Sequence, residues 1–439
     1  WRDWSSDVCS SDLFVAALRR RGITDPSLVL VEPWAAGHFG HADEEGRRLA
    51  YTHAWVRAAP DDNPYAKPID GLHALVDLTT REILRIDDRP EHAPLGSDSA
   101  NFAPGAAGPL RRDLRPLEIV QPEGPSFAVE GHAVRWLDWR FRVGWSPREG
   151  LILYDVAWQD GDRLRPIAWR LALSEMVVPY GAPDAGDARR NAFDLGEYGI
   201  GQLTDSLALG CDCLGQIHYF DMTVHDWHGV PKVIERAVCL HEEDDGILFK
   251  HWHGRTPDVR RGRRLVVSFL ATIGNYVYGI YWSFRPDGAV ACEVKATGIV
   301  FTSGHRPGEP VPWGTVVAPN VQAHVHQHVF NFRLDLDIDG ERNRVLEIDH
   351  ESMPPGPGNP FGNAIGRRET VLATELAARR KVELASARRW RIVNRERRNR
   401  FGEPVGYELV PLVDGKQGGE LIERIRALRS QLGQELGIA

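Results

Sequence analysis

The feature that most constrains this chain is a succession of strand patterns joined by tight turns. From about residue 112 onward, alternating apolar and polar residues predict strands, and Arg264 to Phe284 is a long stretch of this kind. It ends at Arg285-Pro-Asp-Gly288, a sequence suited to a hairpin turn, and a return strand from Ala289 to Phe301 follows. Many strands joined by hairpins over about 300 residues predict a large antiparallel β-sandwich.

A small α+β domain is predicted ahead of the sandwich. Residues 14–21 suit a short helix, and residues 75–86 alternate like a hairpin with a turn near Thr79. Residues 96–108 are rich in Ser, Ala, Gly and Pro, and Ala103-Pro104-Gly105 within them makes a credible linker. We therefore expect four parts: a non-native leader at residues 1–13, the small domain at 14–110, the sandwich at 111–410 and an atypical helical tail at 411–439.

Both ends of the chain differ from the part between them. Residues 1–13 are polar and repeat Ser-Ser-Asp, without the basic start and apolar stretch of a secretory signal. We expect this leader to lie outside the fold. In the tail, apolar residues recur at helical spacing, at Leu421, Ile425, Leu428, Leu432 and Leu436. They predict an amphipathic helix, which is either docked on the body or foreign to it.

Composition and charge exclude several classes of protein. The 53 Lys and Arg against 61 Asp and Glu leave a net charge of −8, so we expect no nucleic-acid partner. No apolar run approaches the ~18 residues of a membrane helix, so we expect no membrane association. The compartment stays unknown, with the cytoplasm or periplasm of a bacterium both open. Five cysteines are too few for a disulfide scaffold, although a single bridge is possible.

Three histidines stand at alternate positions in the segment His324-Val-His326-Gln-His328. Because side chains alternate on a strand, the three share a face with apolar residues from Phe330 onward. Neighbours on one face lie about 7 Å apart, so two imidazoles can converge on one ion, whereas His324 to His328 spans about 13 Å. A metal pair is favoured over two hydrogen-bonded core histidines, and imidazoles suit copper, zinc, nickel or iron. A third histidine ligand has to come from upstream, because none follows His350.

Other clusters point less clearly to a site. The pair His251 and His253 has the same spacing, but the Gly and Pro that follow indicate a loop. The run from His241 lacks the second histidine of a metalloprotease helix. The thiols of Cys211, Cys213 and Cys239 could hold a metal, although three thiols without a fourth partner favour a disulfide.

Several blocks of the sequence resemble, in order, those of the copper amine oxidases. Thr272-Ile-Gly-Asn275-Tyr276 matches the family signature Thr-x-x-Asn-Tyr, and the His-x-His strand follows downstream. Further matching blocks are Ser174–Gly181, Asn191–Tyr198, Leu209–Gly215, His241–Asp244 and Ala296–Gly298. The likeness covers roughly residues 25–410, and residues 63–86 are similar to the small domain, called N3, that precedes the family's catalytic sandwich.

The resemblance implies a primary-amine oxidase that uses copper(II) and topaquinone, a cofactor made from a tyrosine of the chain. It makes Tyr276 the topaquinone precursor and Asp194 the base that takes the substrate's α-proton. Tyr180 would be the hydrogen-bond partner of the quinone, and Asn275 would orient the quinone ring. His326 and His328 would be two of three copper ligands. Substrates would be a primary amine and molecular oxygen, and products an aldehyde, ammonia and hydrogen peroxide.

The resemblance implies three further features. Cys213 and Cys239 would form a disulfide. Asp335 and Leu336 would bind a peripheral divalent cation such as calcium or manganese through a carboxylate and a backbone carbonyl. The protein would be a homodimer.

The sequence departs from the family pattern at three places. Val277 stands where an acidic residue usually follows the precursor tyrosine. Ala192 stands where many bacterial relatives carry an aromatic gate, so a wider amine channel is expected. The family's third copper histidine lies in a C-terminal segment that residues 411–439 do not resemble, which makes the sandwich C-terminally incomplete.

Because two histidines bind copper poorly, we expect this polypeptide to have little or no oxidase activity. The alternatives are a non-catalytic β-sandwich remnant acting as a binding module and a mononuclear zinc hydrolase that uses the histidine pair.

Overall fold

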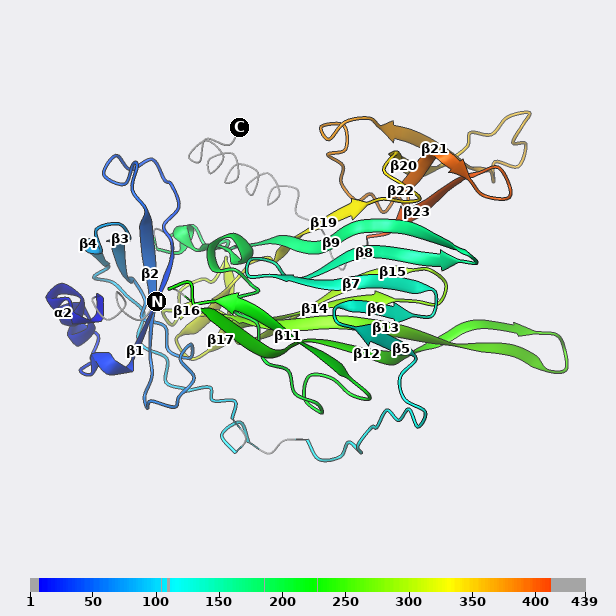
Figure 1. The fold of residues 1–439 in the computed structure, drawn as a ribbon. Helices are drawn as coiled ribbons and strands as arrows, with labels where there is room; N and C mark the ends of the chain where they lie inside the picture. Colours follow the sequence, from blue (N-terminus) through cyan, green and yellow to red (C-terminus); the bar gives the residue numbers. More distant parts are fainter. Residues whose placement is uncertain (1–7, 104, 109–110, 185, 227, 412–439) are drawn as a thin grey trace.

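The computed structural model describes residues 8–411 apart from 104, 109–110, 185 and 227. A small domain with a four-stranded sheet lies at one end of the molecule, and antiparallel sheets of a large sandwich make up most of the rest (Figure 1). The predicted fold class, mainly β with a small α+β domain in front of an antiparallel sandwich, is confirmed.

The small domain packs one helix on a four-stranded antiparallel sheet. Its elements are α2 (Asp12–Arg20), the 3₁₀ turn η1 (Pro26–Leu28), β1 (Val29–Ala35), β2 (Leu49–Val56), β3 (Leu72–Asp77) and β4 (Glu82–Asp88). Phe14, Ala17 and Leu18 share one face of the helix and are buried, as the helical period requires. The predicted hairpin is present, with Asp77 paired to Glu82 across its turn.

The leader requires a correction, because residues 8–13 belong to this domain instead of lying outside the fold. Val8 is fully buried and packs in the same cluster as Phe14 and Leu18. Helix α2 itself begins at Asp12. The reason is hydrophobic burial, since Val8 lies inside this cluster and Cys9 packs against it. The predicted amphipathic helix of the tail lies outside the described residues.

Two antiparallel sheets form the sandwich. One sheet contains β5 (Phe127–Glu130), β6 (Ala133–Trp136), β7 (Trp139–Ser146), β8 (Gly150–Asp160), β9 (Arg163–Pro179), β10 (Asn191–Phe193) and β19 (Val329–Leu336). The other contains β11 (His218–His225), β12 (Pro231–Trp252), β13 (Pro257–Ile273), β14 (Tyr276–Phe284) and β15 (Val290–Gly298). Aromatic side chains join the two sheets, and Phe141 stacks on Phe284 with ring centroids 4.5 Å apart.

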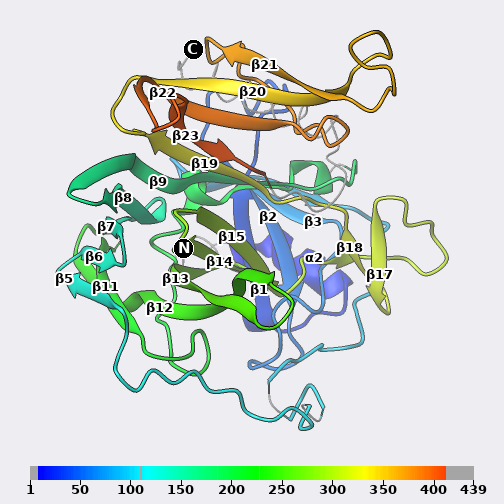
Figure 2. The same ribbon diagram turned by 90° about the vertical axis from the view of Figure 1, so that its right-hand side faces the viewer.

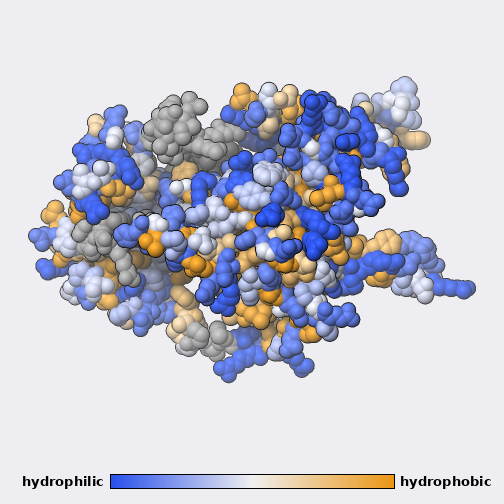
Figure 3. Space-filling view, in the orientation of Figure 1, coloured by the Kyte–Doolittle hydropathy of each residue, from blue (hydrophilic) through white to orange (hydrophobic). Residues whose placement is uncertain are grey.

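Two smaller sheets flank the sandwich (Figure 2). They contain β16 (Ser303–Gly304), β17 (Gly314–Ala318) and β18 (Val321–His324), and β20 (Asn343–Ser352), β21 (Ile365–Leu372), β22 (Arg389–Arg398) and β23 (Pro404–Leu409). Two short helical turns, η2 (Asp187–Arg189) and η3 (Asp194–Tyr198), lie on either side of β10. No helix in the described part of the chain is long and apolar enough to cross a membrane. Hydrophilic residues cover most of the visible face, with apolar ones in small groups (Figure 3).

Two strand predictions need correction at the positions that matter for the site. The stretch from Arg264 to Phe284 is a hairpin, since β13 ends at Ile273 and β14 begins at Tyr276. The turn between them contains Gly274 with φ of 58°, a left-handed conformation that glycine adopts without steric cost. The histidine segment, expected to be a strand, is interrupted: β18 ends at His324 and β19 begins at Val329. Between them, His326 makes only an isolated bridge with Tyr180.

Candidate active site

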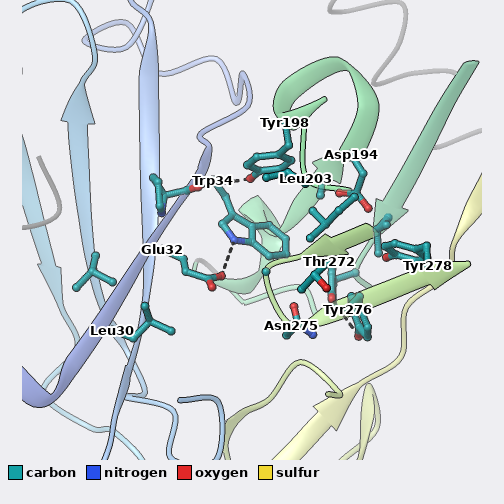
Figure 4. A pocket seen from close by; sticks show the side chains of 17 residues that line it. Leu30, Glu32, Trp34, Asp194, Tyr198, Leu203, Thr272, Asn275, Tyr276 and Tyr278 are labelled. Atoms are coloured by element: carbon teal, nitrogen blue, oxygen red, sulfur yellow. Dashed lines mark hydrogen bonds between the residues drawn. The ribbon is translucent and has the colours of Figure 1, made fainter. Parts of the chain in front are cut away.

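A cavity of about 370 Å³ lies where the small domain meets the sandwich. Side chains of β1 line one side of it, and side chains from β14, β9 and the β10–η3 segment line the other (Figure 4). All four residues predicted to take part in catalysis are in its lining, namely Tyr180, Asp194, Asn275 and Tyr276. The fold therefore brings together residues that are distant in the sequence.

Tyr276 is the first residue of β14, directly after the turn. Its hydroxyl lies 2.8 Å from Nε2 of His326. The other ring nitrogen of His326, Nδ1, lies 2.9 Å from the backbone oxygen of His324 and donates its proton to it. This leaves Nε2 with a lone pair directed at Tyr276, whose hydroxyl donates to it.

Tyr278 and His328 repeat this pairing one step along the two segments. The Tyr278 hydroxyl lies 3.0 Å from Nδ1 of His328, and the ring centroids of His326 and His328 are 5.1 Å apart. Sequence reasoning missed Tyr278. Its position two residues after Tyr276, and hence on the same face of a strand, was the signal that could have found it.

The two histidines fit a metal ion. Burial lowers the pKa of His328 to about 4, so its ring is neutral and able to ligate. A ring nitrogen anchored on a carbonyl, as in His326, is the usual outer contact of a metal-binding histidine. Within the described ranges, no group of three His, Cys, Asp or Glu is arranged to hold a metal. Those ranges thus supply two imidazoles beside the phenol oxygen of Tyr276.

Asp194 lies at the start of η3 and is 3 % exposed. Burial raises the pKa of its carboxyl to about 7, the charge of Glu175 adds to the rise, and a hydrogen bond with Tyr278 opposes it. A carboxyl with this pKa exchanges protons near neutral pH, as a general base must. Asp194 therefore has the chemistry that the resemblance assigns to it.

Tyr180 and Asn275 hold the surroundings of Tyr276. The Tyr180 hydroxyl lies 3.4 Å from that of Tyr276, and its ring stacks on His326 with centroids 4.7 Å apart. Burial raises the pKa of Tyr180 well above its usual value, so its hydroxyl keeps a proton to donate. Asn275 donates from Nδ2 to the backbone oxygen of Ile299 at 2.6 Å, and this bond holds the start of β14 against the segment after β15.

His324 lies apart from the other two histidines. Its Nδ1 is 3.3 Å from a guanidinium nitrogen of Arg190, 3.4 Å from Oγ of Ser303 and 3.5 Å from a carboxylate oxygen of Asp187. These contacts hold its ring in a buried polar cluster behind the site. This arrangement agrees with the expectation from strand geometry that only two of the three histidines lie close enough to bind one ion.

Cys213 and Cys239, which the resemblance pairs in a disulfide, are free thiols in the structure. Both pack with Leu207 in one small cluster. Each sulfur has a hydroxyl neighbour instead: Tyr219 lies 3.3 Å from Sγ of Cys213, and Ser268 lies 3.2 Å from Sγ of Cys239.

The residues predicted for a peripheral cation lie on β19, outside the cavity. Asp335 forms an ion pair with Arg333 at 3.3 Å, and both side chains are largely exposed. Leu336 pairs with Ala168 of β9. Two of the three departures from the family pattern are single residues within the described part of the chain. Ala192 lines the cavity, whereas Val277 does not and alternates with Tyr276 and Tyr278 along β14.

Comparison with known proteins identifies the family to which the chain belongs. The family model "Copper amine oxidase, enzyme domain" matches residues 128–418, and the model of the family's N3 domain matches residues 5–105. The chain belongs to the copper amine oxidase family. Copper and topaquinone are the cofactors that membership of this family implies.

Relatives in this family cover nearly the whole chain. A primary amine oxidase of Arthrobacter sp. (strain P1) is 47 % identical over 409 residues, which are 92 % of this chain and 62 % of that protein. A histamine oxidase of Arthrobacter globiformis is 47 % identical over 411 residues, 92 % of this chain and 59 % of that protein. The chain thus spans about three fifths of the length of these two copper amine oxidases.

A solved structure shows the same fold. The copper-containing benzylamine oxidase of Hansenula polymorpha superimposes with a TM-score of 0.83 at 32 % identity, over 95 % of this chain and 67 % of that one. The antiparallel sandwich described above is therefore the architecture of a copper amine oxidase.

Proposed function

We propose that this chain carries the quinone-forming and amine-binding parts of a primary-amine oxidase, which converts a primary amine, oxygen and water to an aldehyde, ammonia and hydrogen peroxide. The contact between the Tyr276 hydroxyl and Nε2 of His326, beside the cavity that Asp194 lines, carries this proposal. The names of its relatives, a primary amine oxidase and a histamine oxidase, support it.

Each residue of the site has a separate role, which follows from its position. Copper held by His326 and His328 would supply the redox chemistry that makes topaquinone from Tyr276 and lets it accept electrons from the amine. Asp194 takes the proton that leaves the substrate's α-carbon, since its raised pKa lets it hold that proton near pH 7. Tyr180 donates a hydrogen bond to the oxygen of residue 276, and Asn275 keeps the start of β14 in place.

The apolar part of the cavity binds the carbon chain of the amine and excludes water. Trp34, Leu203 and Ile273 line it, and Ala192 leaves space where a larger side chain would narrow it. Burial of methylene groups against these walls stabilises the bound amine by about 0.8 kcal/mol for each group.

Carbonyl labelling tests this function. The purified chain is incubated with copper(II) in air, treated with phenylhydrazine and digested for peptide mapping. In the parent, any label that forms is expected on the peptide that contains Tyr276. In the Tyr276→Phe variant, no label is expected. A label that persists in Tyr276→Phe, or that falls on Tyr278, would contradict the proposed role.

The prediction of little or no oxidase activity applies to this 439-residue polypeptide. Catalytic metal sites generally use three protein ligands, and the described residues place two imidazoles beside Tyr276. Copper content and quinone staining of the expressed chain check it: a red protein with one equivalent of copper contradicts this prediction but agrees with the proposed function.

Two further parts of the proposal rest on the family resemblance. A homodimer is expected in sedimentation, and a monomer at all concentrations would exclude it. A cation at Asp335 and Leu336 would have to displace Arg333 from the carboxylate of Asp335. Calcium or manganese should then raise the melting temperature of the parent and leave that of Asp335→Asn unchanged.

A further inference from the structure

Glu32 places a second carboxylate in the cavity, away from Asp194 and on the side of the small domain (Figure 4). It lies on β1, where it pairs with His53 of β2. Two side chains hold its orientation. The Tyr65 hydroxyl donates to Oε1, and Nε1 of Trp34 donates to Oε2 at 3.5 Å.

This carboxylate lacks a cationic partner. In the described part of the chain, no arginine, lysine or histidine forms an ion pair with Glu32. Other buried carboxylates of the same region are paired, Glu44 with Arg189 at 2.8 Å and Asp187 with Arg190. A buried carboxylate without a counter-charge costs free energy, and a cationic ligand would recover part of that cost. Burial accordingly raises the pKa of Glu32, while the hydrogen bonds from Tyr65 and Trp34 lower it.

The carboxylate of Glu32 lies close to the turn that precedes Tyr276. A Cβ at Gly274 would stand 3.7 Å from each of its oxygens. Gly274 is two residues before Tyr276, and because the chain turns at Gly274 their backbones are separated by less than the roughly 7 Å that two extended residues span. The carboxylate therefore lies within the length of a small aliphatic amine from the reacting end of the cavity.

The space between the two ends suits a methylene chain. Trp34, Leu203 and Ile273 form apolar walls, and Leu30 lines the cavity on the same strand as Glu32. An amine bound with its reacting end at Tyr276 would direct its other end toward Glu32. A cationic group there meets a carboxylate, whereas a methyl group there leaves the carboxylate unpaired.

We propose that Glu32 binds a second ammonium group at the far end of the substrate, so that this site prefers short α,ω-diamines to monoamines of the same length. This inference rests on the proposed function, because it takes the cavity to be the amine site. It adds the class of amine and the residue that selects it.

Direct binding tests the inference without turnover. Isothermal titration calorimetry compares diaminobutane with butylamine on the parent chain, on Glu32→Gln and on Glu130→Gln, an exposed residue of β5. The parent and Glu130→Gln should bind the diamine about tenfold more tightly than the monoamine. Glu32→Gln, whose amide oxygen still accepts from Tyr65, should bind the two amines equally.

A second variant keeps the test independent of how well Glu32→Gln folds. Glu32→Asp retains the charge but withdraws it by one methylene, so it should shift the preference from diaminobutane toward diaminopentane. Equal affinities in the parent, or a preference for diaminobutane that both variants retain, would overturn the role of Glu32 and leave the amine site intact. Failure of both amines to bind the parent would instead contradict the proposed function.

Discussion

The hydroxyl of Tyr276 lies 2.8 Å from Nε2 of His326, although the two residues are 50 positions apart in the chain. Two local features produce this contact. The turn at Gly274 makes Tyr276 the first residue of β14, and the bridge between His326 and Tyr180 carries the histidine segment past it. Because alternate residues share a face, the same register also places Tyr278 against His328.

Tyr278→Phe should weaken copper binding about tenfold, because it removes the hydroxyl that orients the ring of His328. Copper titration calorimetry measures the effect. Tyr281→Phe is the matched control, since Tyr281 lies on the same strand and faces Lys295 across the sheet. Equal affinities for the two variants would show that Tyr278 does not position the ligand.

Asp194→Asn should change how stability depends on pH. The pKa of Asp194 is about 7 in the folded protein against 3.8 for an ordinary aspartate. Between these values the folded protein holds a proton that the unfolded chain has released. The contribution of Asp194 to stability is therefore fully present below pH 3.8 and is lost as pH rises to about 7.

Urea unfolding of parent and Asp194→Asn between pH 4 and 8 measures this change. Between pH 4 and 8, the free energy of unfolding of the variant should rise by on the order of 3 kcal/mol relative to that of the parent. Above pH 8 this difference should stay constant. Burial raises the pKa of Glu197 to about 8, and the charge of Asp194 adds to this rise. Removing that charge makes ionisation of Glu197 less costly in the folded protein, which also stabilises the variant as pH rises. Asp162→Asn, in an exposed turn, serves as control, and the same pH profile in both variants would refute the assignment.

Much of the fold was predictable because its signals are local. The hairpin of β3 and β4 and the turn at Asp287 follow from alternation and turn residues, which act over a few positions. The boundary at Gly274 was missed because a Gly-Asn turn inside a long apolar stretch breaks the alternation only briefly. Val8 was missed for a related reason, since one apolar residue makes no period.

The candidate site was predictable only in part, because its residues come from different chain segments. The alternating histidines identified His326, and the resemblance supplied Tyr276, Asp194 and Tyr180. Glu32 lines the cavity from the small domain, more than 200 residues before Tyr276 in the sequence. No local sequence pattern predicts that two such distant residues line the same cavity. Only the packing of one domain on the other shows it.

Asn275→Ala should destabilise the protein by about 1–3 kcal/mol, because the backbone oxygen of Ile299 would lose a buried hydrogen bond. Urea unfolding monitored by tryptophan fluorescence measures the loss. Asn331→Ala, on the exposed face of β19, should stay within about 0.5 kcal/mol of the parent. A neutral Asn275→Ala would show that its side chain does not hold this turn.

Cys213 and Cys239 should form the disulfide that the family resemblance implies when the protein is oxidised. Their loop closure should then stabilise the fold by about 3 kcal/mol, reversibly on reduction. Thiol counting by mass spectrometry and melting temperatures with and without reductant check this. Cys213→Ser should lose the effect and Cys292→Ser should keep it, whereas reductant-insensitive stability would exclude the bridge.

Copper(II) binding measured by calorimetry and by electron paramagnetic resonance tests most directly whether His326 and His328 form the metal site beside Tyr276. His251→Ala provides the background, because the exposed pair of His251 and His253 has ring nitrogens 3.1 Å apart and could bind copper itself. In this background we predict weak copper binding with two nitrogen ligands, lost in His326→Ala and in His328→Ala and unchanged in His228→Ala. Copper binding that survives removal of both His326 and His328 would contradict the assignment.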